Sequence, residues 1–373
     1  MSEHHSVIII GAGLSGLYTA WRLRQQQHDV QLHDVLILEA RDRTGGRILS
    51  PQVTENSNSG IDLGAGWSWP QLQPRLEHLF NQLDVKLFKQ FTSGDILYEM
   101  KPDAVERYTG PSSHQQSYRI VNGGETLIEA LGSRLPAASI QLNSEVVSIQ
   151  HEPSEIKVMR NGASYLYSAD NIILALPPRI ASNRISFHPA LTDNIQQAWE
   201  RVSTWMAAQC KIVFIYDVPF WRKQNLSGEV FSQHGPLTEL YDASAADESF
   251  YALTSFVGIS AVQRQALDKE QLIELCMQQL HRLFGDESHH VRDIQIKDWS
   301  TDIYTSTDID INRQAAHPQY PESMPPAIWD QHLILAGTEV AQSHAGYLEG
   351  ALVSADVALS LLGVDDFAIQ QKS

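Results

Sequence analysis

Residues 7–16 read Val-Ile-Ile-Ile-Gly-Ala-Gly-Leu-Ser-Gly, an apolar run that ends in a GxGxxG pattern. The run predicts a short buried parallel strand, and residues 14–25 predict a helix directly after it. Gly11 permits the tight turn from strand to helix, Gly13 lets a pyrophosphate approach the backbone, and Gly16 lets helix and strand pack closely. The free N–H groups at the start of the helix would then bind the phosphates.

A carboxylate follows at the distance expected of a dinucleotide-binding unit. The next apolar run, Val35 to Leu38, predicts a second strand, and Glu39 ends it. A carboxylate at that strand end can accept hydrogen bonds from a ribose, which indicates an unphosphorylated 2′-hydroxyl. The alternative is an ordinary strand–helix–strand unit without a ligand. Because the strands, glycines, helix and acid occur together and in order, the stretch predicts dinucleotide binding.

The segment after Glu39 indicates which dinucleotide is bound. Residues 40–47 read Ala-Arg-Asp-Arg-Thr-Gly-Gly-Arg, which resembles the E-A-x-x-R-x-G-G-R continuation of the flavin amine oxidase family. The resemblance implies that the cofactor is FAD and that the turn formed by Gly45, Gly46 and Arg47 lies against the pyrophosphate and the flavin. Arginine offers phosphate a planar fork, and paired glycines let backbone amides approach it.

Further family motifs follow in order along the chain. Residues 60–67 resemble a glycine-rich segment that lies near the isoalloxazine in the family, which makes Trp67 a candidate for the cavity wall. For Trp69 we expect an ordinary position in the core. Residues 121–131 match an element that returns the chain to the FAD domain. Residues 143–146 resemble L-N-x-x-V, which implies that the backbone of Val146 contacts the adenine.

The C-terminal part carries a second strong signature. Residues 336–339 read Ala-Gly-Thr-Glu and residues 344–351 read His-Ala-Gly-Tyr-Leu-Glu-Gly-Ala, which is similar to the family's A-G-(T/E)-(E/T)…G-Y-x-E-G-A. The resemblance implies that Glu339 contacts the ribityl side of FAD. Together, the motifs predict cofactor contacts from Gly11, Gly13, Leu14, Ser15, Gly16, Glu39, Ala40, Arg41, Gly45, Gly46, Arg47, Gly64, Ala65, Gly66, Trp67, Val146, Trp299, Gly337, Thr338, Glu339, Gly346, Tyr347, Leu348 and Ala351.

Two residues are candidates for catalysis. Lys211 precedes Pro219 by eight residues, the spacing at which the family has a lysine that holds a water against flavin N5. An ammonium there can stabilise reduced flavin or assist oxygen reduction. The alternative is a solvated lysine, which its apolar neighbours on the strand disfavour. Tyr347 could form one wall of an aromatic slot for the amine, and a core tyrosine is the alternative.

The sequence departs from the family downstream of Trp299. Members that bind flavin covalently place a cysteine there, whereas residues 304–311 contain none, so FAD should be noncovalent and acid should release it. The second aromatic of the slot is also missing. Ile309 is nearest by spacing, and Tyr304 or His344 could replace it.

The predicted fold class is α/β, with a Rossmann-type FAD-binding domain interleaved with a smaller α+β substrate domain. The FAD domain is expected to comprise residues 1–75, 118–185 and 295–373. The substrate domain is expected to comprise residues 76–117 and 186–294. Residues 76–83 predict a helix, and irregular polar sequence is expected after it.

Composition excludes several other classes of protein. The chain of 373 residues has a formal charge of −17, which argues against nucleic acid or an anionic membrane as a partner and weakly suits a cationic substrate. Two cysteines and the lack of a signal peptide or of about 18 consecutive apolar residues predict a soluble, cytoplasmic protein. The paired histidines lack partners at ligand spacing, so no metal site is expected. The oligomeric state stays open.

The leading functional hypothesis is FAD-dependent oxidation of an amine to an imine, with dioxygen reoxidising the flavin and giving hydrogen peroxide. One alternative is a related desaturase or dehydrogenase with a non-amine substrate or another electron acceptor, which the incomplete aromatic slot favours. Another is a catalytically silent flavin-binding partner subunit. Peroxide production on amines would separate the first hypothesis from the other two.

Overall fold

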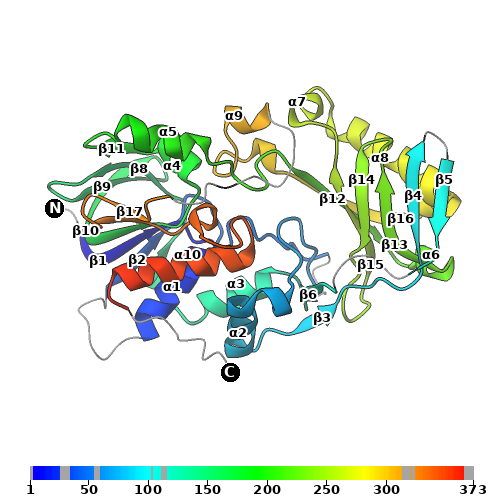
Figure 1. Ribbon diagram of the computed structural model, residues 1–373, viewed down its shortest axis with the longest axis horizontal. Helices are drawn as coiled ribbons and strands as arrows, with labels where there is room; N and C mark the ends of the chain where they lie inside the picture. The colour runs from blue at the N-terminus through cyan, green and yellow to red at the C-terminus, as the bar shows by residue number, and fades with distance from the viewer. Residues whose placement is uncertain are drawn as a thin grey trace.

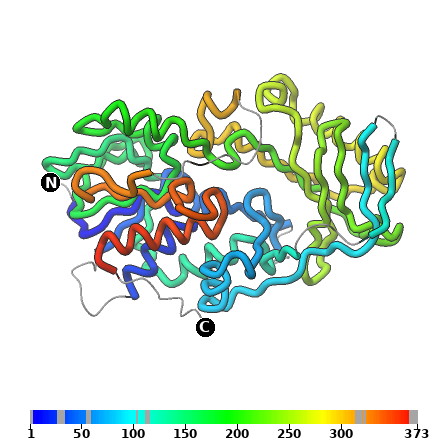
Figure 2. Tube along the Cα trace, viewed as in Figure 1, coloured from blue at the N-terminus to red at the C-terminus, as the bar shows by residue number. Residues whose placement is uncertain are grey.

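Two large sheets lie at opposite ends of the molecule in the computed structural model (Figure 1). The structure describes residues 3–25, 34–53, 59–101, 104–110, 116–312, 320 and 324–364. Within these residues the chain starts in the first sheet, enters the second, returns, enters the second again and ends in the first (Figure 2). The two halves are therefore interleaved in sequence, as the fold prediction requires.

The first sheet has a parallel centre built around the glycine-rich strand. Its strands lie in the order β7 (Ile140–Gln141), β2 (Val35–Leu38), β1 (Glu3–Ile10), β10 (Ala163–Leu174) and β18 (Leu333–Leu335), with β17 (Ala327–Ile328) beside β18. Successive side chains of a strand point to opposite faces. Val7 and Ile9 therefore pack on one face, and Ile8 and Ile10 pack on the other.

Helices cover one face of this parallel centre, in an α/β arrangement typical of Rossmann-type domains. The core on that side joins β1 to residues of α1 (Leu14–Gln25), α2 (Pro74–Leu83), α3 (Glu125–Gly132) and α10 (Leu348–Leu361). The helix α1 has the predicted bounds. The opposite face packs against α4 (Pro178–Arg184) and α5 (Asp193–Arg201).

An antiparallel extension continues the first sheet through β10. The first half of β10 pairs with β9 (Glu155–Arg160), β9 pairs with β8 (Ser144–Gln150), and β11 (Ser186–His188) runs parallel to β8. The sequence Asn161-Gly162 predicts a hairpin turn, and this turn joins β9 to β10, with φ values of 51° and 78°. Alternating apolar residues predict one strand over residues 140–149, but Asn143 has a φ of 52° and divides it into β7 and β8.

The second sheet is mainly antiparallel. Its strands lie in the order β16 (Val291–Asp298), β12 (Cys210–Tyr216), β15 (Tyr251–Val257), β14 (Leu237–Asp242), β13 (Leu226–Ser232), β4 (Asp95–Lys101) and β5 (Ala104–Tyr108). The helix α8 (Lys269–Phe284) packs on one face, and a capping box between Asp268 and Gln271 fixes its start. The remaining short helices are α6 (Phe220–Lys223), α7 (Ala261–Arg264), α9 (Asp308–Ile311) and the 3₁₀ turns Pro70–Leu72, Ala137–Ser139, Asp286–His289, Trp299–Thr301 and Thr338–Val340.

The prediction of irregular structure after residue 83 is wrong. That segment forms β4, β5 and β3 (Leu87–Lys89), which pairs with β6 (Tyr118–Ile120). Its polar residues form ion pairs within the fold, because Glu99 is fully buried against Arg282 and Asp95 pairs with Arg107. Because Arg282, the partner of Glu99, lies far away in the sequence, the sequence of this segment alone resembles that of a solvated loop.

The predicted domain limits remain a prediction. Sheet membership places β11 (residues 186–188) in the first sheet, although the predicted limit at 186 assigns it to the substrate domain. The strand β16 (residues 291–298) belongs to the second sheet and crosses the predicted limit at 295. The polar sequence of residues 51–59 predicts a loop, of which residues 54–58 lie outside the described residues.

Candidate functional site

The three glycines of the GxGxxG motif have different structural roles. An added Cβ at Gly16 would lie 2.0 Å from the carbonyl oxygen of Gly11, and one at Gly11, whose φ is 107°, would lie 2.8 Å from the carbonyl oxygen of Ala175. A Cβ at Gly13 would meet only the backbone of Gly45 and Gly46, at 4.0 Å. The fold thus requires Gly11 and Gly16, whereas Gly13 leaves room for a ligand.

Glu39 ties the end of β2 to this glycine turn. Its carboxylate is 3% exposed and accepts hydrogen bonds from the backbone N–H groups of Ala12, at 2.8 Å, and Arg41, at 2.9 Å. The carboxylate also borders a cavity of about 100 Å³. The cavity brings Glu39, Ala40 and Arg41 together with Val146, as the sequence predicts for a nucleoside site.

Tyr304 closes this first cavity, together with Arg41 and with Arg184, which the sequence motifs do not indicate. Its ring lies between the guanidinium groups of Arg41 and Arg184, 5.3 and 5.0 Å from the ring centroid, and its hydroxyl donates to Glu145. The suggestion that Tyr304 replaces an aromatic of the substrate slot is therefore wrong. A flat ring between two cations suits the nucleoside end of the site.

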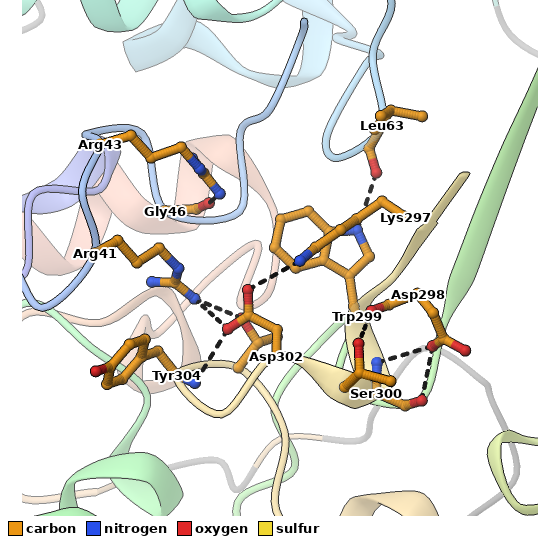
Figure 3. A network of polar contacts seen from close by, with 12 residues as sticks. Arg41, Arg43, Gly46, Leu63, Lys297, Asp298, Trp299, Ser300, Asp302 and Tyr304 are labelled. Carbon is orange, nitrogen blue, oxygen red and sulfur yellow. Dashed lines mark hydrogen bonds and ion pairs between the residues drawn. The ribbon is translucent and has the colours of Figure 1, made fainter. Parts of the chain in front are cut away.

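The loop after Trp299 is anchored to the cofactor loops by polar contacts (Figure 3). Asp302 accepts from the guanidinium of Arg41 at 2.7 Å and from the ammonium of Lys297 at 3.2 Å. The indole of Trp299 donates to the carbonyl of Leu63 at 2.9 Å. Trp299 is fully buried and lines neither this cavity nor the second, larger cavity described below. The predicted cofactor contact of Trp299 is therefore replaced by a structural one, the hydrogen bond that fixes the backbone at Leu63.

A second cavity of about 640 Å³ lies between the two sheets. Most of the predicted cofactor contacts line it: Gly13, Leu14, Ser15, Gly45, Gly46, Arg47, Gly64, Ala65, Gly66, Trp67, Gly337, Thr338, Gly346, Tyr347, Leu348 and Ala351. The two cavities share four lining residues: Gly46, Arg47, Ala175 and Leu176. A dinucleotide can therefore extend from one cavity into the other, past the start of α1, and these residues fit FAD.

Arg47 and Glu339 form a buried ion pair beside that junction. Two nitrogens of the guanidinium donate to the two carboxylate oxygens, at 2.6 and 3.1 Å. Burial alone would lower the pKa of Arg47, but the ion pair with Glu339 raises it above its ordinary value. The sequence predicts cofactor contacts for both residues and did not indicate that they pair with each other.

Lys211 lies in β12 with its ammonium pointing at the wall of the second cavity. It is 1% exposed, its Nζ donates to the carbonyl of Gly64 at 3.0 Å, and the ammonium lies 4.8 Å from the ring centroid of Trp67. Burial lowers its pKa to about 8, with a smaller opposing effect from Asp62. The structure rules out a solvated strand lysine. Gly64 and Trp67 separate Lys211 from the cavity.

An aromatic pair stands on the wall of the same cavity. The rings of Tyr347 and Trp69 lie 6.4 Å apart, edge to face, and Tyr347 is 41% exposed. Trp69 is half-buried, so the expectation of a core position for it is wrong. Ile309 and His344 are exposed and do not line the cavity. Trp69 is thus the aromatic residue that contacts Tyr347 on the cavity wall, which sequence spacing around Trp299 could not reveal.

Replacing Glu39 with alanine should weaken FAD binding about tenfold, because the ribose and the backbone N–H groups of Ala12 and Arg41 would lose one acceptor. The measurement is the dissociation constant of FAD from titrations of the apoprotein. Glu77→Ala, which removes an exposed carboxylate from α2, is the control. Equal FAD affinity in the Glu39 and Glu77 variants would remove the ribose assignment.

Other site types have no support among the residues described. They contain no group of three or more His, Cys, Asp or Glu side chains placed to hold a metal ion. None of their helices is long and apolar enough to cross a membrane.

Comparison with known proteins agrees with this geometry. The family model described as flavin containing amine oxidoreductase matches residues 98–358, and a model for an NAD(P)-binding Rossmann-like domain matches residues 9–83. A probable flavin-containing monoamine oxidase A of Dictyostelium discoideum is 28% identical over 95% of this chain and 96% of its own length. An L-amino acid dehydrogenase of Synechocystis is 22% identical over 94% and 93%.

Solved structures agree in fold. The structure of putrescine oxidase bound to putrescine superimposes with a TM-score of 0.80 at 19% identity, over 97% of this chain and all of that one. The resemblance of the sequence motifs to flavin amine oxidases is confirmed, and so is the FAD cofactor. The chain belongs to the family of flavin containing amine oxidoreductases and is an FAD-dependent oxidoreductase.

Proposed function

We propose that this protein oxidises a small amine to an imine and passes the electrons to dioxygen, which gives hydrogen peroxide. The observation that carries the proposal is the large cavity, which has the Trp69–Tyr347 pair on its wall and the buried ammonium of Lys211 directly behind it. Bound FAD would accept two electrons and a proton equivalent from the amine. An aliphatic amine can pack against these two rings, which exclude water and orient its α-carbon.

The protein needs no nucleophile of its own for this reaction. Lys211 would place a positive charge, or a water hydrogen-bonded to it, at the cavity wall where negative charge develops during oxygen reduction. Its low pKa would also allow it to give up a proton near pH 8.

An anaerobic spectral titration against primary amines, polyamines and amino acids tests the proposal. We expect one amine class to bleach the flavin band, and air to restore the band with release of hydrogen peroxide. Bleaching that air does not reverse would favour a dehydrogenase with another acceptor, which the similarity to an L-amino acid dehydrogenase makes the second candidate. A flavin that no amine bleaches would contradict amine oxidation.

We expect the flavin to be bound noncovalently. The chain has two cysteines, Cys210 and Cys276, and both are fully buried in the core of the second sheet, outside both cavities. Burial raises the pKa of each thiol to about 12, so neither is reactive. Acid precipitation should leave all FAD in the supernatant; yellow colour in the pellet would show a covalent bond.

A further inference from the structure

The second cavity has a carboxylate on its wall that the proposed chemistry does not use. Among the described residues that line the cavity, only Arg47 and Glu239 are charged. The charge of Arg47 is neutralised by its pairing with Glu339. The remaining charge on the wall is therefore the negative charge of Glu239.

Glu239 has no cationic partner within the described part of the chain. Its Oε2 accepts a hydrogen bond from the hydroxyl of Tyr241 at 3.0 Å, and Oε1 accepts none from the described residues. Acids nearby in the same sheet do have partners: Asp242 pairs with Arg222, and Asp298 pairs with Arg264. A carboxylate that faces a cavity without a counter-ion is suited to bind a cation from outside.

Contacts along the wall connect Glu239 to the reaction site. Glu239 and Tyr241 are two residues apart on β14, where Leu240 between them is fully buried in the core. The ring of Tyr241 meets Trp67 edge to face, with centroids 5.5 Å apart. Trp67 is also the ring on which the ammonium of Lys211 lies.

The rest of this wall suits an uncharged carbon chain. Its side chains are mainly apolar: Trp67, Trp205, Met206, Phe256 and Val257. The hydroxyls of Thr238 and Ser260 line the cavity together with Glu239 and add acceptors for an ammonium. The cavity thus offers aromatic rings, an apolar wall and an unpaired carboxylate.

We propose that Glu239 selects amines that carry a second cationic group, of which α,ω-diaminoalkanes are the simplest. This inference rests on the proposed amine oxidation. The reacting nitrogen lies at the Trp69–Tyr347 pair, the methylenes follow the apolar wall, and the distal ammonium donates to Oε1 of Glu239. Tyr241 fixes the carboxylate through Oε2, so that the other oxygen faces the ligand.

Anaerobic titrations of the FAD-loaded protein with diaminoalkanes of increasing length, and with n-alkylamines of matching length, test this inference. The flavin spectrum gives the dissociation constant of the bound amine and the limiting rate of bleaching. We expect one diamine length to be preferred over its matching alkylamine. The variant Glu239→Gln should reduce that preference about tenfold, mainly through the dissociation constant, because the charge of Glu239 is exposed to solvent and therefore screened.

Two further variants make the test specific. Glu239→Asp keeps the charge and should retain part of the preference, with a shift toward longer diamines. Glu106→Gln removes an exposed carboxylate from β5 of the same sheet, outside the cavity, and should change nothing. A diamine preference that is absent, or that survives in Glu239→Gln, would overturn the inference. If alkylamines still bleach the flavin in that case, the proposed amine oxidation is retained. If no amine bleaches the flavin, both the amine oxidation and the diamine selection by Glu239 are contradicted.

Discussion

Lys211→Met should slow reoxidation of the reduced flavin by dioxygen about a hundredfold, while the FAD content stays that of the wild type. The ammonium is fully buried, and it is held by the carbonyl of Gly64 and by the ring of Trp67 on the cavity wall. A fixed positive charge in a water-poor site stabilises developing negative charge far more than the same charge in water. Methionine fills a similar volume without the charge.

The pH dependence gives this prediction a second readout. Burial lowers the pKa of Lys211 to about 8, so the wild-type reoxidation rate should fall as the pH rises above 8, and the variant should lack this step. The unfolded chain keeps its lysine protonated up to its ordinary pKa of 10.5. The unfolded state then binds more protons between pH 8 and 10.5, so this group makes the unfolding free energy rise with pH in that window.

Stopped-flow mixing of reduced protein with oxygenated buffer measures the rate, and Lys223→Met, at an exposed lysine that ends α6, is the control. Equal rates in the Lys211 and Lys223 variants would return Lys211 to a structural role.

Alanine substitutions at two glycines of the same turn should separate cofactor binding from folding. Gly13→Ala adds a Cβ that touches no protein atom closer than 4.0 Å, so the apoprotein should keep its stability. The methyl group would occupy the space that the pyrophosphate needs, and a steric cost of about 3 kcal/mol corresponds to a hundredfold weaker FAD affinity. Gly16→Ala places its Cβ 2.0 Å from a backbone oxygen and should destabilise the apoprotein by about 3 kcal/mol.

Denaturant unfolding of the apoproteins and FAD titration measure the two effects. Gly132→Ala is the control, since a Cβ at the end of α3 would meet nothing within 4 Å. Wild-type FAD affinity in Gly13→Ala would show that the pyrophosphate does not cross this turn. An unchanged apoprotein stability in Gly16→Ala would contradict the packing of α1 on β1.

The features that the sequence predicted well are local ones. The glycine turn and the bounds of α1 depend on residues within a few positions, because strand ends, turns and helix starts are short-range. Glu39 could be placed at the first cavity because it ends a strand next to the glycine turn. The resemblance to the family motifs also allowed Lys211 and Tyr347 to be predicted as residues at the second cavity.

The features that were missed depend on distant partners. Trp69 meets Tyr347 across 278 positions, and Arg47 pairs with Glu339 across 292. The polar strand β4 looked like loop because Arg282, the partner of Glu99, lies on α8. Spacing along a chain carries no information on such pairs, and only the folded arrangement of the two sheets brings them together.

The strand order of the first sheet has a consequence for synthesis on the ribosome. β1 begins at residue 3, yet its neighbour β10 ends at residue 174 and β18, on the far side of β10, ends at residue 335. At about 5–20 residues per second, translation reaches that last strand roughly 20–70 s after the first. Once β10 is made, its edge toward β18 therefore stays unpaired while strands β12 to β16 of the second sheet are made. Newly made chains should depend on holding chaperones during this interval.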